Sequence, residues 1–190
     1  MSATDAAARR EQLVALYKEV SKCTKCPLYE TRTKAVFGAG NADADLMFVG
    51  EAPGAEEDRQ GLPFVGRAGQ LLNQLLEEIG LSREDVFICN VLKSRPPDNR
   101  DPQPAELQAC EPYLWEQVRL IEPRVVCTLG NFATPLLTGS PTGITRVRGT
   151  PQTHELGGRT VHLLPLFHPA AALRTPAVKE QLRADFATIP

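Results

Sequence analysis

The stretch Asp45-Leu-Met-Phe-Val-Gly-Glu-Ala-Pro-Gly54 places a short apolar segment directly before a turn-rich loop. Such a segment predicts a buried strand, because it is short and apolar and is followed by Gly and Pro. Three more segments of this kind follow along the chain, at residues 86–91, 124–129 and 160–167. The sequence therefore predicts a sheet of four strands, with residues 45–49 as the first.

Segments with apolar residues at helical spacing alternate with these strands. They cover residues 7–20, 67–79, 104–121, 130–138 and 177–187. Strands that alternate with helices predict an α/β fold, here a three-layer α/β/α sandwich around a central, mostly parallel four-stranded sheet. Residues 144–160 predict irregular or hairpin-like structure, and Pro112 is expected to kink its helix or to start a new one.

The first helix is predicted to be amphipathic. Its apolar residues Leu13, Val14, Leu16, Tyr17 and Val20 recur at helical spacing, and we expect them to form one face toward the core.

Length and composition predict a single domain over residues 1–190, because 190 residues with 42% hydrophobic side chains can bury one core. The formal net charge of −2 argues against long non-specific tracking along DNA, although a local basic face remains possible. No apolar stretch is long enough to span a membrane, and the N-terminus lacks the apolar core of a signal peptide. We therefore expect a cytoplasmic protein without a membrane partner.

The five cysteines are expected to be reduced thiols or metal ligands, as is usual inside cells. Cys23 and Cys26 form a C-x2-C pair, a turn that points two thiolates at one metal. Cys110 and Cys127 are candidate partners, whereas Cys89 lies in the middle of a predicted strand and is interpreted as a small buried hydrophobe. From spacing alone, zinc, an iron–sulfur cluster and unrelated buried cysteines all remain open.

The loops that leave the predicted strands carry the unusual polar and Gly-rich sequences. They comprise residues 50–58, 90–100 and 168–174. In a parallel sheet the loops after the strands share one edge, where ligands bind. Segments far apart in the sequence are therefore expected to meet at one site.

Four motifs occur in order along the chain: Gly50-Glu-Ala-Pro-Gly-Ala-Glu-Glu-Asp58, Pro63-Phe-Val-Gly66, Asn90 and His168-Pro-Ala-Ala-Ala-Leu-Arg174. With the cysteines, they make the chain resemble the family 4 uracil-DNA glycosylases, the bacterial and archaeal iron–sulfur branch of their superfamily. The resemblance implies a DNA repair enzyme that flips uracil out of DNA and hydrolyses its N-glycosidic bond, leaving an abasic site. It also implies a nucleoid-associated monomer that acts on single- or double-stranded DNA containing uracil.

The resemblance further implies a 4Fe–4S cluster held by Cys23, Cys26, Cys110 and Cys127. Such a cluster would tie the N-terminal helix and cysteine loop, residues 7–30, to the rest of the domain. We expect its role to be structural.

Three side chains are expected to bind the flipped uracil. Phe64 would offer a stacking surface, although an aromatic residue there can also cap the core. Asn90 would pair with uracil N3–H and O4, since a side-chain amide has an acceptor beside a donor; the alternative is a turn-capping Asn. His168 would donate to uracil O2 as negative charge develops on the leaving base. His154 and His162 lie outside the motifs and are interpreted as structural.

The loop after the first strand is expected to complete the pocket. Gly50, Glu51 and Ala52 would contact uracil, in part through backbone N–H groups. One carboxylate should orient water and stabilise the cationic sugar, and both Glu51 and Glu57 are candidates. At least one of the acidic residues of this loop is expected to be solvated only.

DNA contacts are expected from cations in or beside these loops. The candidates are Arg67, Lys93, Arg95 and Arg174, which would meet phosphates. Leu173 is placed to wedge into the gap that the flipped base leaves.

Two other functions remain open at this point. One is a protein that captures uracil-DNA without turnover, and the other is an iron–sulfur redox protein. The second accounts for the cysteines but not for Phe64, Asn90 or His168.

Overall fold

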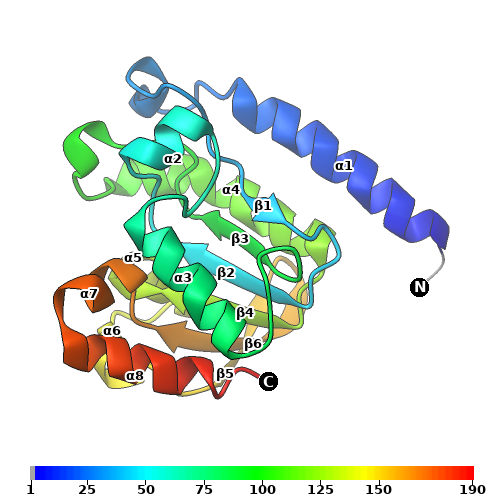
Figure 1. Cartoon of the computed structure of the whole chain (residues 1–190). Helices are drawn as coiled ribbons and strands as arrows, with labels where there is room; N and C mark the ends of the chain where they lie inside the picture. Colours follow the sequence, from blue (N-terminus) through cyan, green and yellow to red (C-terminus); the bar gives the residue numbers. More distant parts are fainter. Residues whose placement is uncertain (1–2) are drawn as a thin grey trace.

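A computed structural model describes residues 3–190 and shows a six-stranded sheet covered by helices on both faces (Figure 1). The strands are β1 (Ala39–Gly40), β2 (Leu46–Gly50), β3 (Phe87–Asn90), β4 (Val125–Leu129), β5 (Gln152–Leu156) and β6 (Arg159–Leu166). Their order is β1-β3-β2-β4-β6-β5. The inner strands β3, β2, β4 and β6 are parallel and correspond to the four predicted strands, whereas β1 and β5 add antiparallel edges.

The helices occupy the connections between the strands. They are α1 (Ala3–Ser21), η1 (Pro27–Glu30), α2 (Ala55–Gln60), α3 (Arg67–Glu78), η2 (Pro97–Asn99), α4 (Pro104–Ile121), α5 (Gly130–Thr138), α6 (Ile144–Val147), α7 (Pro169–Arg174) and α8 (Pro176–Phe186). The predicted hairpin is present as β5 and β6, with α6 before it. Among the described residues, no helix is long and apolar enough to cross a membrane.

Two predictions about the helices need correction. Residues 55–60 and 169–174 were expected to be loops, but they form the short helices α2 and α7. No second helix starts at Pro112, because α4 runs through it as one element.

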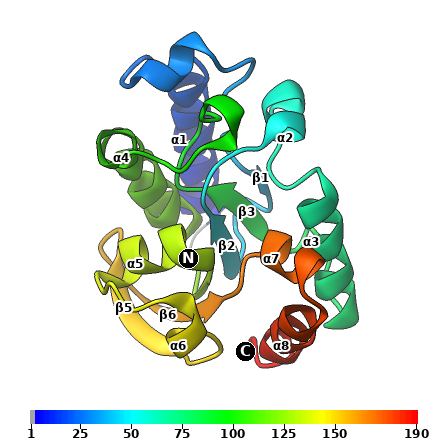
Figure 2. The same cartoon turned by 90° about the vertical axis from the view of Figure 1, so that its left-hand side faces the viewer.

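The sheet separates two apolar cores. Side chains along β2 alternate, so that Met47 and Val49 face α1, α4 and α5 while Leu46 and Phe48 face α3, α7 and α8. Figure 2, which looks at the edge where the parallel strands end, shows α1 and α4 on one side of the sheet and α3 and α8 on the other. The predicted three-layer α/β/α sandwich is therefore confirmed, with two more strands than expected.

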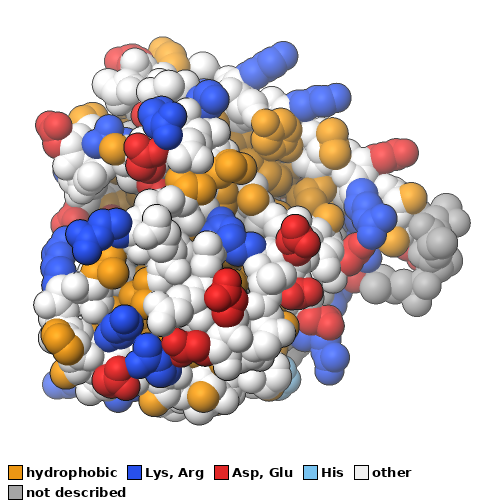
Figure 3. Space-filling model, viewed as in Figure 1, with side chains coloured by type: hydrophobic (Ala, Val, Ile, Leu, Met, Phe, Trp, Pro, Cys, Tyr) orange, Lys and Arg blue, Asp and Glu red, His pale blue; other side chains and the backbone are white. Residues whose placement is uncertain are grey.

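Helix α1 packs on α4 through a narrower apolar face than expected. Leu13, Leu16 and Val20 are buried in the first core. Val14 and Tyr17 are each 52% exposed, and the Tyr17 ring packs edge-to-face with Phe37, with ring centroids 5.6 Å apart. The space-filling view shows an exposed apolar area beside α1 (Figure 3).

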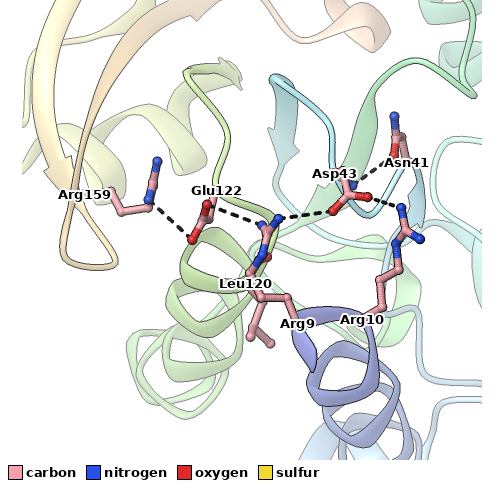
Figure 4. Close-up of polar contacts among 7 residues, drawn as sticks. All are labelled: Arg9, Arg10, Asn41, Asp43, Leu120, Glu122 and Arg159. Atoms are coloured by element: carbon pink, nitrogen blue, oxygen red, sulfur yellow. Dashed lines mark hydrogen bonds and ion pairs between the residues drawn. The ribbon is translucent and has the colours of Figure 1, made fainter. Parts of the chain in front are cut away.

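A polar network fixes the beginning of α1 to the rest of the domain (Figure 4). Arg9 donates to the carbonyl oxygen of Leu120 at 3.0 Å and forms ion pairs with Asp43 at 3.4 Å and Glu122 at 3.5 Å. The neighbouring Arg10 also pairs with Asp43. One arginine thus joins α1, the loop before β2 and the end of α4.

Candidate active site

A cavity of about 670 Å³ opens at the edge where the parallel strands end. Four segments line it: residues 51–57, 64–68, 90–101 and 168–174. Figure 2 shows the corresponding elements α2, α3 and α7 around this edge. The prediction that distant loops meet at one site is confirmed, because parallel strands deliver their following loops to the same edge.

Asn90 is the last residue of β3 and is only 2% exposed. Among the described residues its side-chain oxygen has no hydrogen-bond partner, which is costly for a buried acceptor. A Cβ atom at Gly50 would lie 2.5 Å from this oxygen and 2.7 Å from Cζ of Phe64. Glycine at position 50 therefore allows the amide and the aromatic ring to converge on the cavity.

Phe64 lines the cavity, as expected for a surface on which a base can stack. It is also packed in the second core, as expected for a residue that caps the core. Its backbone is left-handed, with φ of 50°, which is unfavourable for a bulky residue. Arg83 holds this conformation by donating to the carbonyl oxygens of Phe64 at 2.9 Å and Pro63 at 2.6 Å. At Gly69 a Cβ would lie 1.8 Å from the Phe64 oxygen, so the start of α3 must be glycine there.

His168 caps the N-terminus of α7 and lies against Phe64, with ring centroids 5.6 Å apart and ring planes at 27°. Its Nδ1 accepts from the backbone N–H of Ala170 at 3.0 Å. The proton of the neutral ring must then be on Nε2. Burial lowers the pKa of His168 to about 4, against a smaller opposite effect of Glu57, so the side chain is a neutral donor at pH 7.

The two candidate carboxylates have different surroundings. Glu57 accepts from the backbone N–H groups of Gly54 at 3.1 Å, Val65 at 3.2 Å and Gly66 at 3.3 Å, so both oxygens are used to join two walls of the cavity. Glu51 is half-buried in the cavity wall, and no described residue donates a hydrogen bond to its carboxylate. Burial, and to a smaller extent Asp101, raises the pKa of Glu51. Of the two, only Glu51 has free oxygens.

The other acidic residues of this loop have structural or solvated positions. Glu56 is exposed and pairs with Arg59 at 2.8 Å, as expected for a solvated acidic turn. Asp58 is buried and accepts from the backbone N–H of Thr33 at 2.8 Å, which fixes α2 to the preceding segment. Ala52, which was also expected to contact uracil, lines the cavity.

The residues predicted to contact DNA have three kinds of position: exposed at or beside the cavity rim, outside the cavity, or buried. Arg67 and Arg174 are exposed at the cavity rim, and Leu173 beside them is 41% exposed. Figure 3 shows Lys and Arg side chains on the left-hand edge, toward which the parallel strands point. Arg95 does not line the cavity and donates to Asn99 at 2.7 Å.

Lys93 cannot contact DNA as predicted, because its side chain is completely enclosed. Its ammonium donates to the backbone oxygen of Asn90 and to Oε1 of Gln117, both at 2.7 Å. Gln117 in turn donates to the carbonyl oxygen of Phe37 at 2.8 Å. Burial lowers the pKa of Lys93. Lys93 thus connects the end of β3 to α4 and positions Asn90, a role that the loop-like sequence did not indicate.

Comparison with known proteins identifies the family. The model of the uracil DNA glycosylase superfamily matches residues 37–187. A type-4 uracil-DNA glycosylase of Archaeoglobus fulgidus is 45% identical over 183 residues, 94% of this chain and 92% of the relative. The chain belongs to the type-4 uracil-DNA glycosylases. Another type-4 member, from Thermotoga maritima, is 51% identical over 167 residues, covering 87% of this chain and 85% of the relative.

A type-5 uracil-DNA glycosylase of Pyrobaculum aerophilum is similar over a shorter region, with 36% identity over 109 residues and 50% of this chain. The extent of similarity thus agrees with the type-4 assignment. The family resemblance stated from the motifs is confirmed.

In this type-4 uracil-DNA glycosylase, three of the four predicted cysteine ligands lie near one another. Cys26 and Cys110 belong to one small apolar cluster with Leu28 and Leu92. Burial raises the pKa of both thiols, and Cys23 is close enough to raise them further. Cys127 is not part of this group, because it points from β4 into the second core, on the other side of the sheet.

The predicted set of four cysteines therefore does not fit an iron–sulfur cluster, although type-4 membership is consistent with such a cofactor. Within residues 3–190, no three His, Cys, Asp or Glu side chains are already arranged to hold a metal. Cys89 is packed in the first core, in agreement with its interpretation as a buried hydrophobe.

Proposed function

We propose that this protein excises uracil from DNA by hydrolysing the N-glycosidic bond, which leaves an abasic site. One observation carries the proposal: the side-chain oxygen of Asn90 is buried, without a partner among the described residues, at the wall of a cavity that also presents Phe64 and His168. A buried acceptor of this kind is stabilised when a ligand donates to it. The N3–H of uracil is such a donor, and the relatives are named for this base.

Recognition of the base follows from the direction of its hydrogen bonds. The Asn90 oxygen accepts from N3–H of uracil, and its NH₂ group donates to O4. Cytosine has an acceptor at N3 and a donor at N4, so a fixed amide in this orientation rejects it. Lys93 holds the backbone of Asn90 and thereby limits rotation of the strand end. The face of Phe64 supports the base by stacking.

Bond cleavage requires stabilisation of charge on both sides of the bond. As the bond breaks, its electron pair moves to the base, and Nε2–H of His168 donates to the developing negative charge on O2. The Glu51 carboxylate stabilises the cationic sugar and orients the water that adds to C1′. Glu57 does not take this role, because its oxygens are bound to backbone N–H groups. It positions the cavity walls.

The DNA around the flipped nucleotide is proposed to lie across the cavity rim. Arg67 and Arg174 contact phosphates there, and Leu173 fills the gap in the base stack. The protein acts as a monomer in this proposal. A 4Fe–4S cluster would join residues 7–30 to the rest of the domain.

Excision is tested with a uracil-containing oligonucleotide, followed by alkaline cleavage of abasic sites. We expect strand scission by the wild-type protein and a loss of about 100-fold or more in single-turnover rate for Asn90→Ala and His168→Ala. Asn41→Ala is the matched control, because Asn41 is an exposed amide that does not line the cavity and should leave the rate near wild type.

The outcomes separate the alternatives. Absence of scission with a shifted band on a native gel identifies a protein that captures uracil-DNA without turnover. Absence of both overturns the proposal and favours a redox role. Wild-type rates in Asn90→Ala would show that another residue reads the base.

A further inference from the structure

We propose that Ser94, rather than Cys127, completes the ligand set of the iron–sulfur cluster, with Cys23, Cys26 and Cys110 as the three thiolates. The proposal rests on the presence of a cluster, stated under the proposed function, and it does not depend on uracil excision. It assigns to this chain a cluster with one oxygen ligand.

Cys127 is excluded by the geometry of the sheet. It lies in the middle of β4, with its side chain in the core formed with α3, α7 and α8. Cys110 lies on α4, which covers the opposite face. Side chains of a strand alternate between faces, so Cys127 reaches the other side only if β4 shifts by one residue. Such a shift would turn every side chain of this central strand to the wrong face.

The three remaining thiols gather at one corner of the molecule. Cys26 and Cys110 pack in one apolar cluster together with Leu92. Cys23 lies three residues before Cys26 in the sequence. The backbone N–H of Lys93 lies close enough to Cys110 to lower the pKa of its thiol, against the larger opposite effect of burial. Residues 92–93, shortly after β3, therefore lie beside Cys110.

Ser94 follows immediately on this segment and is 4% exposed. Its hydroxyl oxygen accepts from a guanidinium nitrogen of Arg32 at 3.0 Å, but it donates to no acceptor among the described residues. Arg32 lies two residues after η1 and near Cys26, whose pKa burial raises and Arg32 lowers. The Ser94 hydroxyl therefore lies beside Arg32, which neighbours Cys26, and one residue after Lys93, which neighbours Cys110, and this places it at the same corner as the thiols.

Other candidates near the thiols are already engaged. The carboxylate of Glu106 is bound by Arg100, at 2.5 and 3.0 Å, and by the backbone N–H of Gln103. Cys89 is buried within β3 in the first core, and Lys93 is the only charged neighbour that affects the pKa of its thiol, which burial raises. The buried hydroxyl of Tyr113, near Cys23, also has no partner among the described residues, but only Ser94 combines a place directly after Lys93 with a contact to Arg32.

An oxygen ligand changes the chemistry of one iron. Serinate is harder than thiolate and holds iron less firmly in a sulfur-bridged cluster. On oxidation by ferricyanide, the 4Fe–4S cluster of charge 2+ gives up one electron and releases one Fe²⁺. A 3Fe–4S cluster of charge 1+ remains, bound by the three cysteines. The iron at Ser94 is the one that leaves.

The test compares full-length variants that are expressed and purified without oxygen. Iron and sulfide content, absorbance and electron paramagnetic resonance are measured before and after addition of ferricyanide. Thermal melting confirms that each variant is folded. Cys127→Ala and Cys89→Ala are matched controls, since both remove a buried thiol that is not a proposed ligand.

We expect Cys127→Ala and Cys89→Ala to keep the wild-type content of iron. Ser94→Ala should already contain the three-iron cluster when it is purified. In ferricyanide, Ser94→Cys should keep the four-iron cluster about tenfold longer than the wild-type protein does. Cys110→Ser should lose most of its iron.

Two results would overturn the proposal. The first is loss of the cluster in Cys127→Ala while both Ser94 variants behave as wild type. The second is wild-type protein without iron after reconstitution with iron and sulfide. Scission of uracil-DNA by the same preparations shows separately whether the glycosylase function stands.

Discussion

Two glutamates of one loop have opposite local environments. Glu57 satisfies three backbone N–H groups, whereas Glu51 has free oxygens and a pKa that burial raises. The sequence could not separate them, because both lie in the same motif and their partners, Val65 and Gly66, belong to another loop. The family resemblance did indicate Asn90 and His168 as pocket residues; Asn90 ends β3, and His168 follows β6 by two residues.

We therefore expect different effects from two isosteric substitutions. Glu51→Gln should lower the single-turnover rate of uracil release about 100-fold and leave the melting temperature unchanged. Glu57→Gln should lower the free energy of unfolding by about 1–3 kcal/mol, because charged acceptors of backbone N–H groups are lost. Rapid-quench kinetics and urea unfolding measure the two effects. A Glu57→Gln variant that is stable but inactive would show that Glu57, and not Glu51, is the catalytic carboxylate.

At the scale of elements, apolar runs predicted the four inner strands, but not the edges. β1 has two residues, Ala39 and Gly40, and β5 alternates between partly buried and exposed side chains over most of its length. Neither contains the apolar run that marks a buried strand. α2 and α7 were also missed, because helices of six residues show little periodicity. Arg83 was not predicted and Lys93 was assigned to DNA, because the oxygens that accept from them, most of them backbone oxygens, form no sequence motif.

The attachment of α1 gives a prediction about adjacent arginines. The side chain of Arg9 is 13% exposed and joins three elements, whereas that of Arg10 is 61% exposed and has one partner. Arg9→Ala should lower the free energy of unfolding by about 1–2 kcal/mol, and Arg10→Ala by less than about 0.5 kcal/mol. Urea titration followed by circular dichroism measures both. Equal effects would mean that α1 is held by its apolar face alone.

At the scale of the whole molecule, stability is linked to pH through His168. Its pKa of about 4 lies below the usual value of 6.5, so the unfolded chain binds a proton that the folded chain excludes. The free energy of unfolding therefore falls as pH decreases from 6.5 toward 4, by at most about 3 kcal/mol, and is unaffected above this window.

Comparison with His168→Asn isolates this contribution. Asn also caps a helix N-terminus, so the variant should fold and show a shallower loss of stability over the same pH range. Urea unfolding of both proteins between about pH 5 and 7.5 measures the difference. Parallel curves would show that His168 is not the group responsible.

The beginning of α1 and the C-terminus lie away from the cavity. In Figure 1, α1 begins at the right-hand side and the C-terminus lies below, right of centre, whereas the parallel strands point to the left. A tether or a fluorescent reporter joined to either end therefore leaves the cavity rim unobstructed. The protein is suited to oriented capture on a sensor chip, with its cavity turned toward the solution.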